Sequence, residues 1–332
     1  MVGEFVRPKV VISRCIEYEN VRWNAQIVRS EFVEALIPHV EAITICPEVG
    51  IGLGVPRETL RLVKTGSSVR LIQPTTGEDY TEKMFEFIGD FLSDLAEVDG
   101  YILKSRSPTS GLRGVKIYPS IGKVPHIERG SGIFGGIVRE RFGHLALEDE
   151  GRLRNGKIRE HFLRKLYTLA RFREARSWGT FQSLLRFHTE NKLLLKAYRE
   201  KNMREMGRIV ANKEQLSPAS LFDAYGSLLY SALRRPPRCG TYTNVLMNSL
   251  GYFSKKITGG ENQFFLDSLN KYRDGKIPLI VPVDIMRSWI VRFDEEYLAQ
   301  QSFFNPYPDE LLDVSSIVEA CGSRDYWKDE TL

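Results

Sequence analysis

Cysteines, a carboxylate and several hydroxyls lie in loops that follow short apolar segments in the first half of the sequence. Cys15 comes just after residues 9–13, and Cys46 ends the segment 42–46 with Glu48 two residues further on. A third loop, 104–111, follows the segment 100–104 and contains Ser107 and Ser110. Thiolates raised on loops are suited to soft metals and iron–sulfur clusters. These loops are the part of the sequence most suited to carry chemistry.

The spacing of the cysteines alone does not decide between a metal site and ordinary thiols. Cys15 and Cys46 stand 31 positions apart, and the sequence contains no Cys-x-x-Cys. Two small buried cysteines at strand ends remain the alternative interpretation. Cys239 and Cys321 bring the total to 4, too few and too scattered for a disulfide framework. We therefore expect thiols, nucleophiles or metal ligands in a reducing compartment.

The elements that must position these loops alternate between strand and helix. Residues 9–13, 42–46, 69–73 and 100–104 are short β-branched or apolar runs typical of buried strands. Between them, residues 81–98 repeat apolar side chains every three or four positions, which predicts a helix packed on a sheet. The pattern predicts an α/β domain with a mostly parallel sheet. The carboxyl ends of parallel strands meet at one edge, so the three loops should converge there.

The second half of the sequence predicts an all-helical domain. The whole sequence has 332 residues, a length that suits two domains. We place the boundary near residue 150, which gives an α/β domain over 1–150 and a helical domain over 151–332. The expected helices cover residues 159–176, 178–190, 191–212, 218–233, 241–257, 261–273 and 282–304.

Charge separates the same two halves. Residues 1–150 contain 18 Lys and Arg against 21 Asp and Glu, a net −3, whereas residues 151–332 contain 29 against 21, a net +8. Within 151–213 there are 17 basic and 5 acidic residues. Such a block indicates a surface that faces a polyanion, although helices whose charges are paired elsewhere would give the same count. The candidate RNA-binding residues are Arg152, Arg154, Lys157, Arg159, Arg164, Lys165, Arg171, Arg173 and Arg176.

Composition excludes several classes of protein. Hydrophobic residues make up 42% and charged residues 27%, which is typical of a globular chain rather than a disordered one. The longest apolar stretch, 277–286, is too short to cross a membrane. The first residues include Glu4 and lack the pattern of a signal peptide, so we expect a cytoplasmic protein with no membrane partner. The sequence does not indicate the oligomeric state.

Three long motifs resemble a known family. Residues 8–140 look like the thiouracil desulfidase family through Ser13-Arg-Cys-Ile16, Cys46-Pro-Glu-Val49 with Gly52-Leu-Gly-Val-Pro-Arg57, and Lys104-Ser-Arg-Ser-Pro108. Residues 155–312 resemble the helical domain fused to that module in two-domain RNA desulfidases. The matching segments there are Gly240-Thr-Tyr-Thr-Asn244, Gly251-Tyr-Phe253, Tyr272-Arg-Asp-Gly275 and Pro306-Tyr-Pro-Asp309.

The resemblance implies a 4Fe-4S cluster held by three cysteines, with one iron open to take sulfur from a thiolated pyrimidine. Cys15 and Cys46 match the first two ligands. Glu48 matches the family's acid/base carboxylate, and Ser107 matches its catalytic hydroxyl. The reaction implied is a non-redox removal of sulfur as sulfide, in which an activated water replaces it.

The sequence departs from the family at the third ligand, because Ser110 stands where the pattern has a cysteine. A serine hydroxyl is less acidic than a thiol and a harder ligand for iron. The ligand is then lost, or an oxygen-ligated cluster is held more weakly, or Cys239 or Cys321 replaces it. An ordinary thiol near a turn is the alternative for Cys239.

The implied substrate is 4-thiouridine in tRNA, with tRNA bound by the basic helical domain. The resulting hypothesis is a desulfidase that converts 4-thiouridine to uridine. One alternative is a tRNA-binding protein whose cluster site is impaired at Ser110, and another is a desulfidase of free thiouracil.

Two further sequence patterns give weaker evidence for a functional site. Residues 130–135 spell G-x-G-x-x-G, but no strand precedes them, so a tight turn entering a helix is a better interpretation than a dinucleotide site. The 5 histidines lack metal-ligand spacing.

Overall fold

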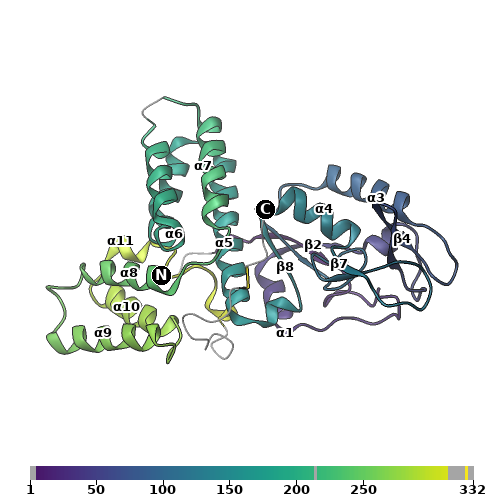
Figure 1. Ribbon diagram of the computed structural model, residues 1–332. Coiled ribbons are helices and arrows are strands. Elements are labelled where there is room, and N and C mark those ends of the chain that lie inside the picture. The colour runs from purple at the N-terminus through teal and green to yellow at the C-terminus, as the bar shows by residue number, and fades with distance from the viewer. Residues whose placement is uncertain (1–4, 213–214, 313–325, 328–332) are drawn as a thin grey trace. The chain divides into compact units, whose positions relative to one another are not determined.

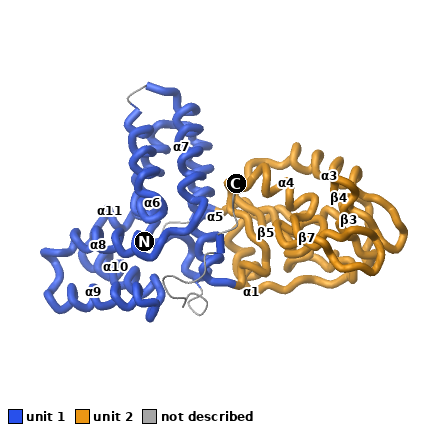
Figure 2. The backbone as a smooth tube through the Cα atoms, in the orientation of Figure 1, with its two compact units in different colours: residues 1–6, 155–332 blue, residues 7–154 orange. Residues whose placement is uncertain are grey.

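The computed structural model describes residues 5–212, 215–312 and 326–327. The chain forms two compact units, coloured separately in Figure 2. Residues 7–154 are called the α/β unit below, and residues 1–6 with 155–332 are called the helical unit. The start of the chain therefore belongs with the helices, where the Phe5 ring meets Tyr167 edge-on at 6.1 Å between centroids.

A parallel sheet forms the centre of the α/β unit, as the alternating pattern predicts (Figure 1). Its strands are β1 (Lys9–Ser13), β2 (Glu41–Ile45), β5 (Gly100–Leu103) and β8 (Ala146–Asp149), in the order β2-β1-β5-β8. Every neighbouring pair is parallel. Residues 10–12 of β1 and 101–103 of β5 are fully buried. Strands covered on both faces need such continuous apolar runs rather than an alternation.

A second sheet holds β3 (Arg61–Thr65), β4 (Ser68–Ile72), β6 (Val115–Tyr118) and β7 (Glu128–Gly130), in the order β4-β3-β6-β7. β3 and β4 pair antiparallel across a short turn in which Gly66 has a φ of 61°. The predicted strand at 69–73 therefore exists as β4 but belongs to a hairpin outside the parallel sheet. Glycine adopts this left-handed backbone without steric cost, which is why the chain turns there.

Helices complete the α/β unit. They are α1 (Glu31–Leu36), α2 (Pro47–Gly50), α3 (Thr81–Asp94) and α4 (Ile133–Phe142). Met84, Ile88 and Leu92 of α3 are buried, as the three-to-four spacing predicts. α2 approaches α3 so closely that a Cβ at Gly50 would lie 2.2 Å from the Phe87 ring. Only glycine allows this contact, which fixes the segment carrying Glu48.

The helical unit consists of α5 (Gly156–Trp178), α6 (Phe181–Val210), α7 (Pro218–Ala232), α8 (Cys239–Leu250), α9 (Gly259–Arg273), α10 (Ile280–Arg292) and α11 (Glu296–Ala299). Side chains cap several of them, with Asn155 at α5, Thr180 at α6 and a complete capping box at α9. α6 and α7 lie along each other (Figure 1). Within the described residues, no helix is long and apolar enough to span a membrane.

Three helix boundaries differ most from those predicted, and the first is that of the expected helix 241–257, which ends at Leu250. The expected helices 178–190 and 191–212 form the single element α6, which bends where Arg199 leaves helical geometry (φ −154°, ψ 100°). The expected helix 282–304 ends at Arg292, and Asp294 follows with a φ of 49°. Apolar periodicity continues through the latter two places, so it does not report a local break in the backbone.

Candidate active site

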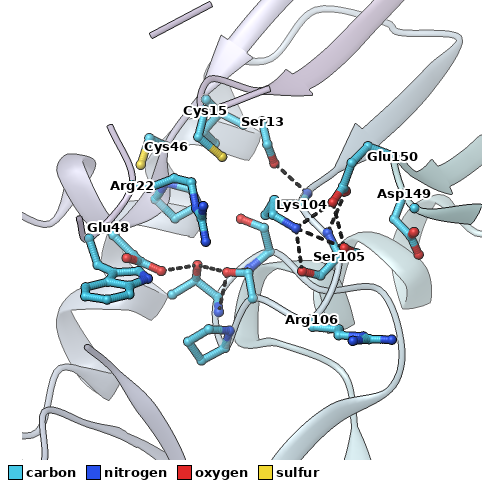
Figure 3. A pocket seen from close by; sticks show the side chains of 18 of the residues that line it. Ser13, Cys15, Arg22, Cys46, Glu48, Lys104, Ser105, Arg106, Asp149 and Glu150 are labelled. Carbon is cyan, nitrogen blue, oxygen red and sulfur yellow. Dashed lines mark hydrogen bonds and ion pairs between the residues drawn. The ribbon is translucent and has the colours of Figure 1, made fainter. Parts of the chain in front are cut away.

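A cavity of about 870 Å³ lies at the carboxyl edge of the parallel sheet (Figure 3). All four strands contribute to its lining, through the residues that follow β1, β2, β5 and β8. β1 has β2 on one side and β5 on the other, so the chain reverses its direction of winding there. Ligands in open α/β sheets bind outside the strand ends at such a point. The three predicted loops do converge at this cavity.

Cys15 and Cys46 both line the cavity as free, half-buried thiols. The backbone N–H of Val28 donates to the Cys15 carbonyl at 2.8 Å, which holds the loop after β1. Cys46 lies directly before α2, and the Gly50 N–H donates to its carbonyl at 2.9 Å. Burial and the neighbouring Cys46 raise the pKa of Cys15 to about 12. Both sulfurs are thus close together and protonated unless a cation or metal stabilises the thiolates.

Glu48 lies on α2 at the same cavity, and its carboxylate is oriented from two sides. Arg57 donates from Nε to Oε2 at 2.8 Å, and its Nη2 lies 2.6 Å from the same oxygen. Arg57 Nη2 also donates to the Val21 carbonyl at 2.9 Å, so the guanidinium is itself fixed. The Glu48 side chain is 14% exposed and that of Arg57 5%. This carboxylate is held at the cavity in a single orientation by a charged partner.

A directed chain of hydroxyls leads from the third loop to Glu48. The N–H groups of Thr109 and Ser110 donate to Ser107 Oγ at 3.2 and 3.1 Å, so that oxygen already accepts twice. Ser107 Oγ lies 2.9 Å from Thr109 Oγ1, and Thr109 donates onward to Glu48 Oε1 at 3.0 Å. The Ser107 proton must therefore point toward Thr109. The sequence-based analysis did not single out Thr109, although it stands inside the motif loop.

The glycines of the G-x-G-x-x-G segment hold this third loop in place. A Cβ at Gly132 would lie 2.5 Å from the Thr109 carbonyl, and one at Gly135 would lie 2.4 Å from the Gly111 carbonyl. The Gly132 N–H donates to the Gly111 carbonyl at 2.8 Å, and the Gly135 N–H donates to the Thr109 carbonyl at 3.0 Å. The start of α4 is thus closed by protein and offers no phosphate site. The glycines permit close packing, but strand β7 (Glu128–Gly130) runs directly into the segment, so the expectation that no strand precedes it was wrong.

A second polar network surrounds Lys104. Lys104 Nζ donates to Glu150 Oε1 at 2.5 Å, and Ser105 donates to Glu150 from both its N–H (2.8 Å) and its hydroxyl (2.6 Å). Burial alone would raise the pKa of Glu150, but Lys104 and the Ser105 hydrogen bonds outweigh it and lower that pKa. Glu150 follows β8, a strand the sequence-based analysis missed because it is short and runs directly into the helical segment. Only the order of strands in the sheet reveals that Glu150 lies at the cavity.

Comparisons with known proteins match the two units separately. The family model described as 2-thiouracil desulfurase covers residues 10–150, and one described as a protein of unknown function (DUF1722) covers residues 192–308. YbbK of Bacillus subtilis (strain 168) is 30% identical over 109 residues, 31% of this chain and 72% of that protein. The chain belongs to the 2-thiouracil desulfurase family.

Two further proteins are similar to parts of this member of the desulfurase family. YbgA of Escherichia coli (strain K12) is 28% identical over 127 residues, 38% of this chain and 75% of YbgA. A solved structure described as the [4Fe-4S]-dependent thiouracil desulfidase TudS is 26% identical, covers 44% of this chain and 93% of its own, and has a TM-score of 0.35. The region matched by the desulfurase model lies wholly within the α/β unit, which is the desulfidase module of this chain.

The donors of this desulfurase do not complete a three-cysteine cluster site. Cys15 and Cys46 supply two soft sulfur atoms, whereas Ser110 lines the cavity with a hard hydroxyl and is 4% exposed. The hydroxyl of Ser110 makes no hydrogen bond within the parts of the chain that the structure describes. Among those residues, no group of three or more His, Cys, Asp and Glu side chains could hold a metal ion. Cys15 and Cys46 therefore suit an iron–sulfur cluster, whereas Ser110 does not suit it as the third ligand.

Cys239 does not supply the missing ligand. Cys239, at the start of α8, is disulfide-bonded, which corrects the expectation of a thiol there. A sulfur already bonded to another sulfur has no thiolate to offer iron. Cys321 lies outside the described residues.

The nine predicted RNA-binding residues divide between the two units and differ in their exposure. Arg152 and Arg154 belong to the α/β unit and line its cavity, where Arg152 donates to Glu148 at 2.8 and 3.2 Å. Arg164 and Lys165 are buried, and Arg164 forms an ion pair with Glu160. Neither of these two side chains is therefore presented to RNA, because both face the core of the helical unit.

The remaining five lie along α5. Arg171 is held by the carbonyls of Asn305 and Pro306 at 3.3 and 2.8 Å, which turns its guanidinium into the unit. Arg176 is exposed and pairs with Asp223 at 2.6 Å. Lys157, Arg159 and Arg173 are half-buried. Charge counting found the basic segment but not the direction of each side chain, which depends on the helix face.

Proposed function

We propose that this chain is a desulfidase that removes the sulfur of 4-thiouridine in tRNA, leaving uridine and sulfide. The observation that carries the proposal is the placement of Glu48, oriented by Arg57 and Thr109 at the cavity that also receives Cys15 and Cys46. A thiolated pyrimidine in this cavity would meet the sulfur atoms of Cys15 and Cys46 and the carboxylate of Glu48. Membership of the desulfurase family supports the same chemistry.

The reaction is a hydrolysis in which atoms balance without a redox partner. Glu48 accepts a proton from water, and the water oxygen attacks the ring carbon that carries sulfur. The carbon–oxygen bond forms, the carbon–sulfur bond breaks, and sulfur leaves as hydrosulfide. The hydroxyls of Ser107 and Thr109 form a chain that donates to the same carboxylate and orients it. The proton left on the attacking oxygen departs with sulfur, and the proton on Glu48 is released to solvent.

Two features of the helical unit support a polynucleotide substrate. Lys192, Arg199 and Arg208 are exposed on α6 and form no ion pair with any residue described. Trp178 and Phe181, at the turn from α5 to α6, are 72% and 39% exposed. Cations with exposed aromatic rings are typical of surfaces that contact phosphates and stack unpaired bases.

The test is anaerobic incubation of the protein with tRNA that contains 4-thiouridine, followed by nucleoside analysis and sulfide measurement. We expect 4-thiouridine to disappear with equal gains of uridine and sulfide. The rate with tRNA should fall steeply as salt rises, because each phosphate contact releases counterions, whereas free 4-thiouracil should be turned over at a rate insensitive to salt. Turnover of free thiouracil alone would replace the proposal with the free-base desulfidase.

Ser110 favours a second candidate, a tRNA-binding protein with an impaired desulfidase centre. Iron and acid-labile sulfide in anaerobically reconstituted wild type and Ser110→Cys separate the two. This chain is the impaired form if Ser110→Cys gains both the cluster and turnover while the wild type has neither. The affinity for tRNA should then be the same in both proteins. Turnover by the wild type excludes this second candidate.

A further inference from the structure

A second cavity adjoins the active site within the α/β unit. It has a volume of about 510 Å³ and lies along residues of β3 and β6, in the sheet that the family motifs do not touch. The two cavities share Arg106, Pro108, Gly114 and Arg129 in their linings. A ligand in the active site can therefore continue into this second cavity, called the basic groove below.

The basic groove is lined by cations and by no acidic residue. Its charged side chains are Arg61, Arg106, Lys116 and Arg129. Residues 1–150 as a whole carry a net −3, so this concentration of positive charge does not follow from the composition of the unit. Arg106, Lys116 and Arg129 form no ion pair or side-chain hydrogen bond with any other residue described. Unpaired cations facing one concave surface attract an anion of matching extent.

An aromatic and guanidinium platform forms another part of the groove. The Arg61 guanidinium lies 4.2 Å from the centre of the half-buried Tyr118 ring, and its Nη1 donates to the Gly122 carbonyl at 2.8 Å. The nearby carboxylate of Glu128 is neutralised by Lys64 at 3.0 Å. Flat guanidinium and aromatic faces with free cations beside them are the recurrent parts of grooves that follow a single nucleic-acid strand.

Arg106 marks the junction of the two cavities. Its backbone has a φ of 57°, a left-handed conformation that disfavours residues other than glycine. The turn it makes lies between Lys104, in the network with Glu150, and Ser107, in the hydroxyl chain to Glu48. Figure 3 shows the Arg106 side chain directed away from both cysteines.

We infer that the basic groove holds the sugar-phosphate backbone next to the thiolated nucleotide, so that the α/β unit itself selects a polynucleotide. This inference rests on the proposed function, whose substrate it narrows. A free base would fill the active site and leave the groove empty. An RNA strand would occupy both, with its phosphates against Lys116, Arg106 and Arg129.

Lys116 is the residue to change, because it is exposed on β6 and lines only the groove. Lys116→Glu and Lys116→Gln are compared with Lys83→Glu, which reverses an exposed charge on α3. The substrates are free 4-thiouracil and a short single-stranded RNA with one 4-thiouridine. We expect Lys116→Glu to lower kcat/KM for the RNA by about tenfold, chiefly through KM, and to reduce the slope of log(kcat/KM) against log(salt) by roughly 0.7.

Activity on free 4-thiouracil should stay unchanged in all three variants, and Lys83→Glu should leave RNA turnover unchanged. Equal losses on both substrates, or no loss on RNA, would overturn the inference. So would an equal effect of Lys83→Glu, which would show a response to net charge. Polyglutamate that competes as well as RNA, and loses affinity equally in Lys116→Glu, would show that the groove recognises charge alone.

Binding of the same RNA, with uridine in place of 4-thiouridine, keeps this inference separate from the proposed function. Fluorescence anisotropy should show about tenfold weaker binding by Lys116→Glu even if no variant turns over substrate. A wild type that is inactive on both substrates contradicts the proposed function alone. Unchanged binding by Lys116→Glu contradicts the groove.

Discussion

The α/β unit and the helical unit both bury ionisable side chains, but they do so in different ways. In the α/β unit Cys15, Cys46, Glu48 and Glu150 face one cavity. In the helical unit Arg164 is enclosed in the core, where it forms an ion pair with Glu160 and lies 5.6 Å from the centre of the Tyr242 ring. A buried charge that faces an empty space is available to a ligand, whereas one paired inside a core maintains the fold. Burial alone therefore does not identify a functional residue.

The histidines of the helical unit show the same point. His161 and His188 each lie 3.0 Å, through Nδ1, from a buried tyrosine hydroxyl, those of Tyr198 and Tyr225. Burial lowers the pKa of both imidazoles. Neither lines the active-site cavity, and burial with a neighbouring lysine accounts for both pKa shifts. They are structural groups of helix packing.

The largest effect expected from this contrast is that of Glu48→Gln. Without an ionised base, kcat should fall between 100- and 10,000-fold, roughly the contribution of general-base catalysis. The free energy of unfolding should also fall, by about 1–3 kcal/mol, because the amide keeps one acceptor oxygen for Thr109 or Arg57 but not for both. Glu86→Gln, on the exposed face of α3, is the matched control and should retain full activity. A fully active Glu48→Gln would remove Glu48 from the mechanism.

Arg164→Ala should show the reverse pattern in the helical unit. Removing the cation leaves Glu160 uncompensated in the core, so the free energy of unfolding should fall by about 3 kcal/mol. Urea denaturation followed by tryptophan fluorescence measures this loss. Turnover of free 4-thiouracil by the remaining folded protein should be unchanged. A stable but inactive variant would place Arg164 in catalysis and break the contrast.

Stability should also depend on pH through His188. Burial, with Lys192 nearby, lowers its pKa to about 4 from a usual 6.5. The unfolded chain then binds a proton at a higher pH than the folded chain, so the stabilising contribution is complete above pH 6.5 and is lost as pH falls toward 4. At pH 5 the loss should be about 2 kcal/mol. Denaturation at pH 7.5 and pH 5 in wild type and His188→Gln measures it, and an equal dependence in both would assign the effect elsewhere.

Thr109→Val should give the smallest effect, a fall in kcat of about tenfold with KM unchanged. Valine keeps the volume of Thr109 but breaks the hydroxyl chain between Ser107 and Glu48. Thr109→Ser restores a hydroxyl at the same position and should recover most of the rate. Because Thr109 is 1% exposed, loss of activity in both variants would indicate a packing defect instead.

The sequence predicted the site more completely than it predicted the sheets. The loops carrying Cys15, Glu48 and Ser107 follow strands, and parallel pairing then requires them to meet. β8 was missed, and with it Glu150, because four residues beside a helix give little periodic signal. β4 was assigned to the wrong sheet because a hairpin depends on the turn at Gly66 and not on the strand's own residues.

The direction of side chains was the least predictable property. Arg164 and Arg176 have the same residue type on the same helix, yet one is enclosed and the other exposed. α5 has buried positions all round its middle turns, from His161 to Ala170, so no polar face marks where cations point outward. The positions of Thr109 and Lys116 depended on tertiary contacts in the same way.

Hydrolysis of 4-thiouridine in heavy-oxygen water tests the central claim most directly. Glu48 is proposed to activate water for attack on the carbon that carries sulfur, so each uridine formed should contain one heavy oxygen at the former position of sulfur. Mass spectrometry of nucleosides from the treated tRNA measures this. One heavy oxygen per uridine in the wild type, with uridine formed roughly 100- to 10,000-fold more slowly by Glu48→Gln, is the predicted result. Unchanged 4-thiouridine, or uridine without the label, would contradict the account.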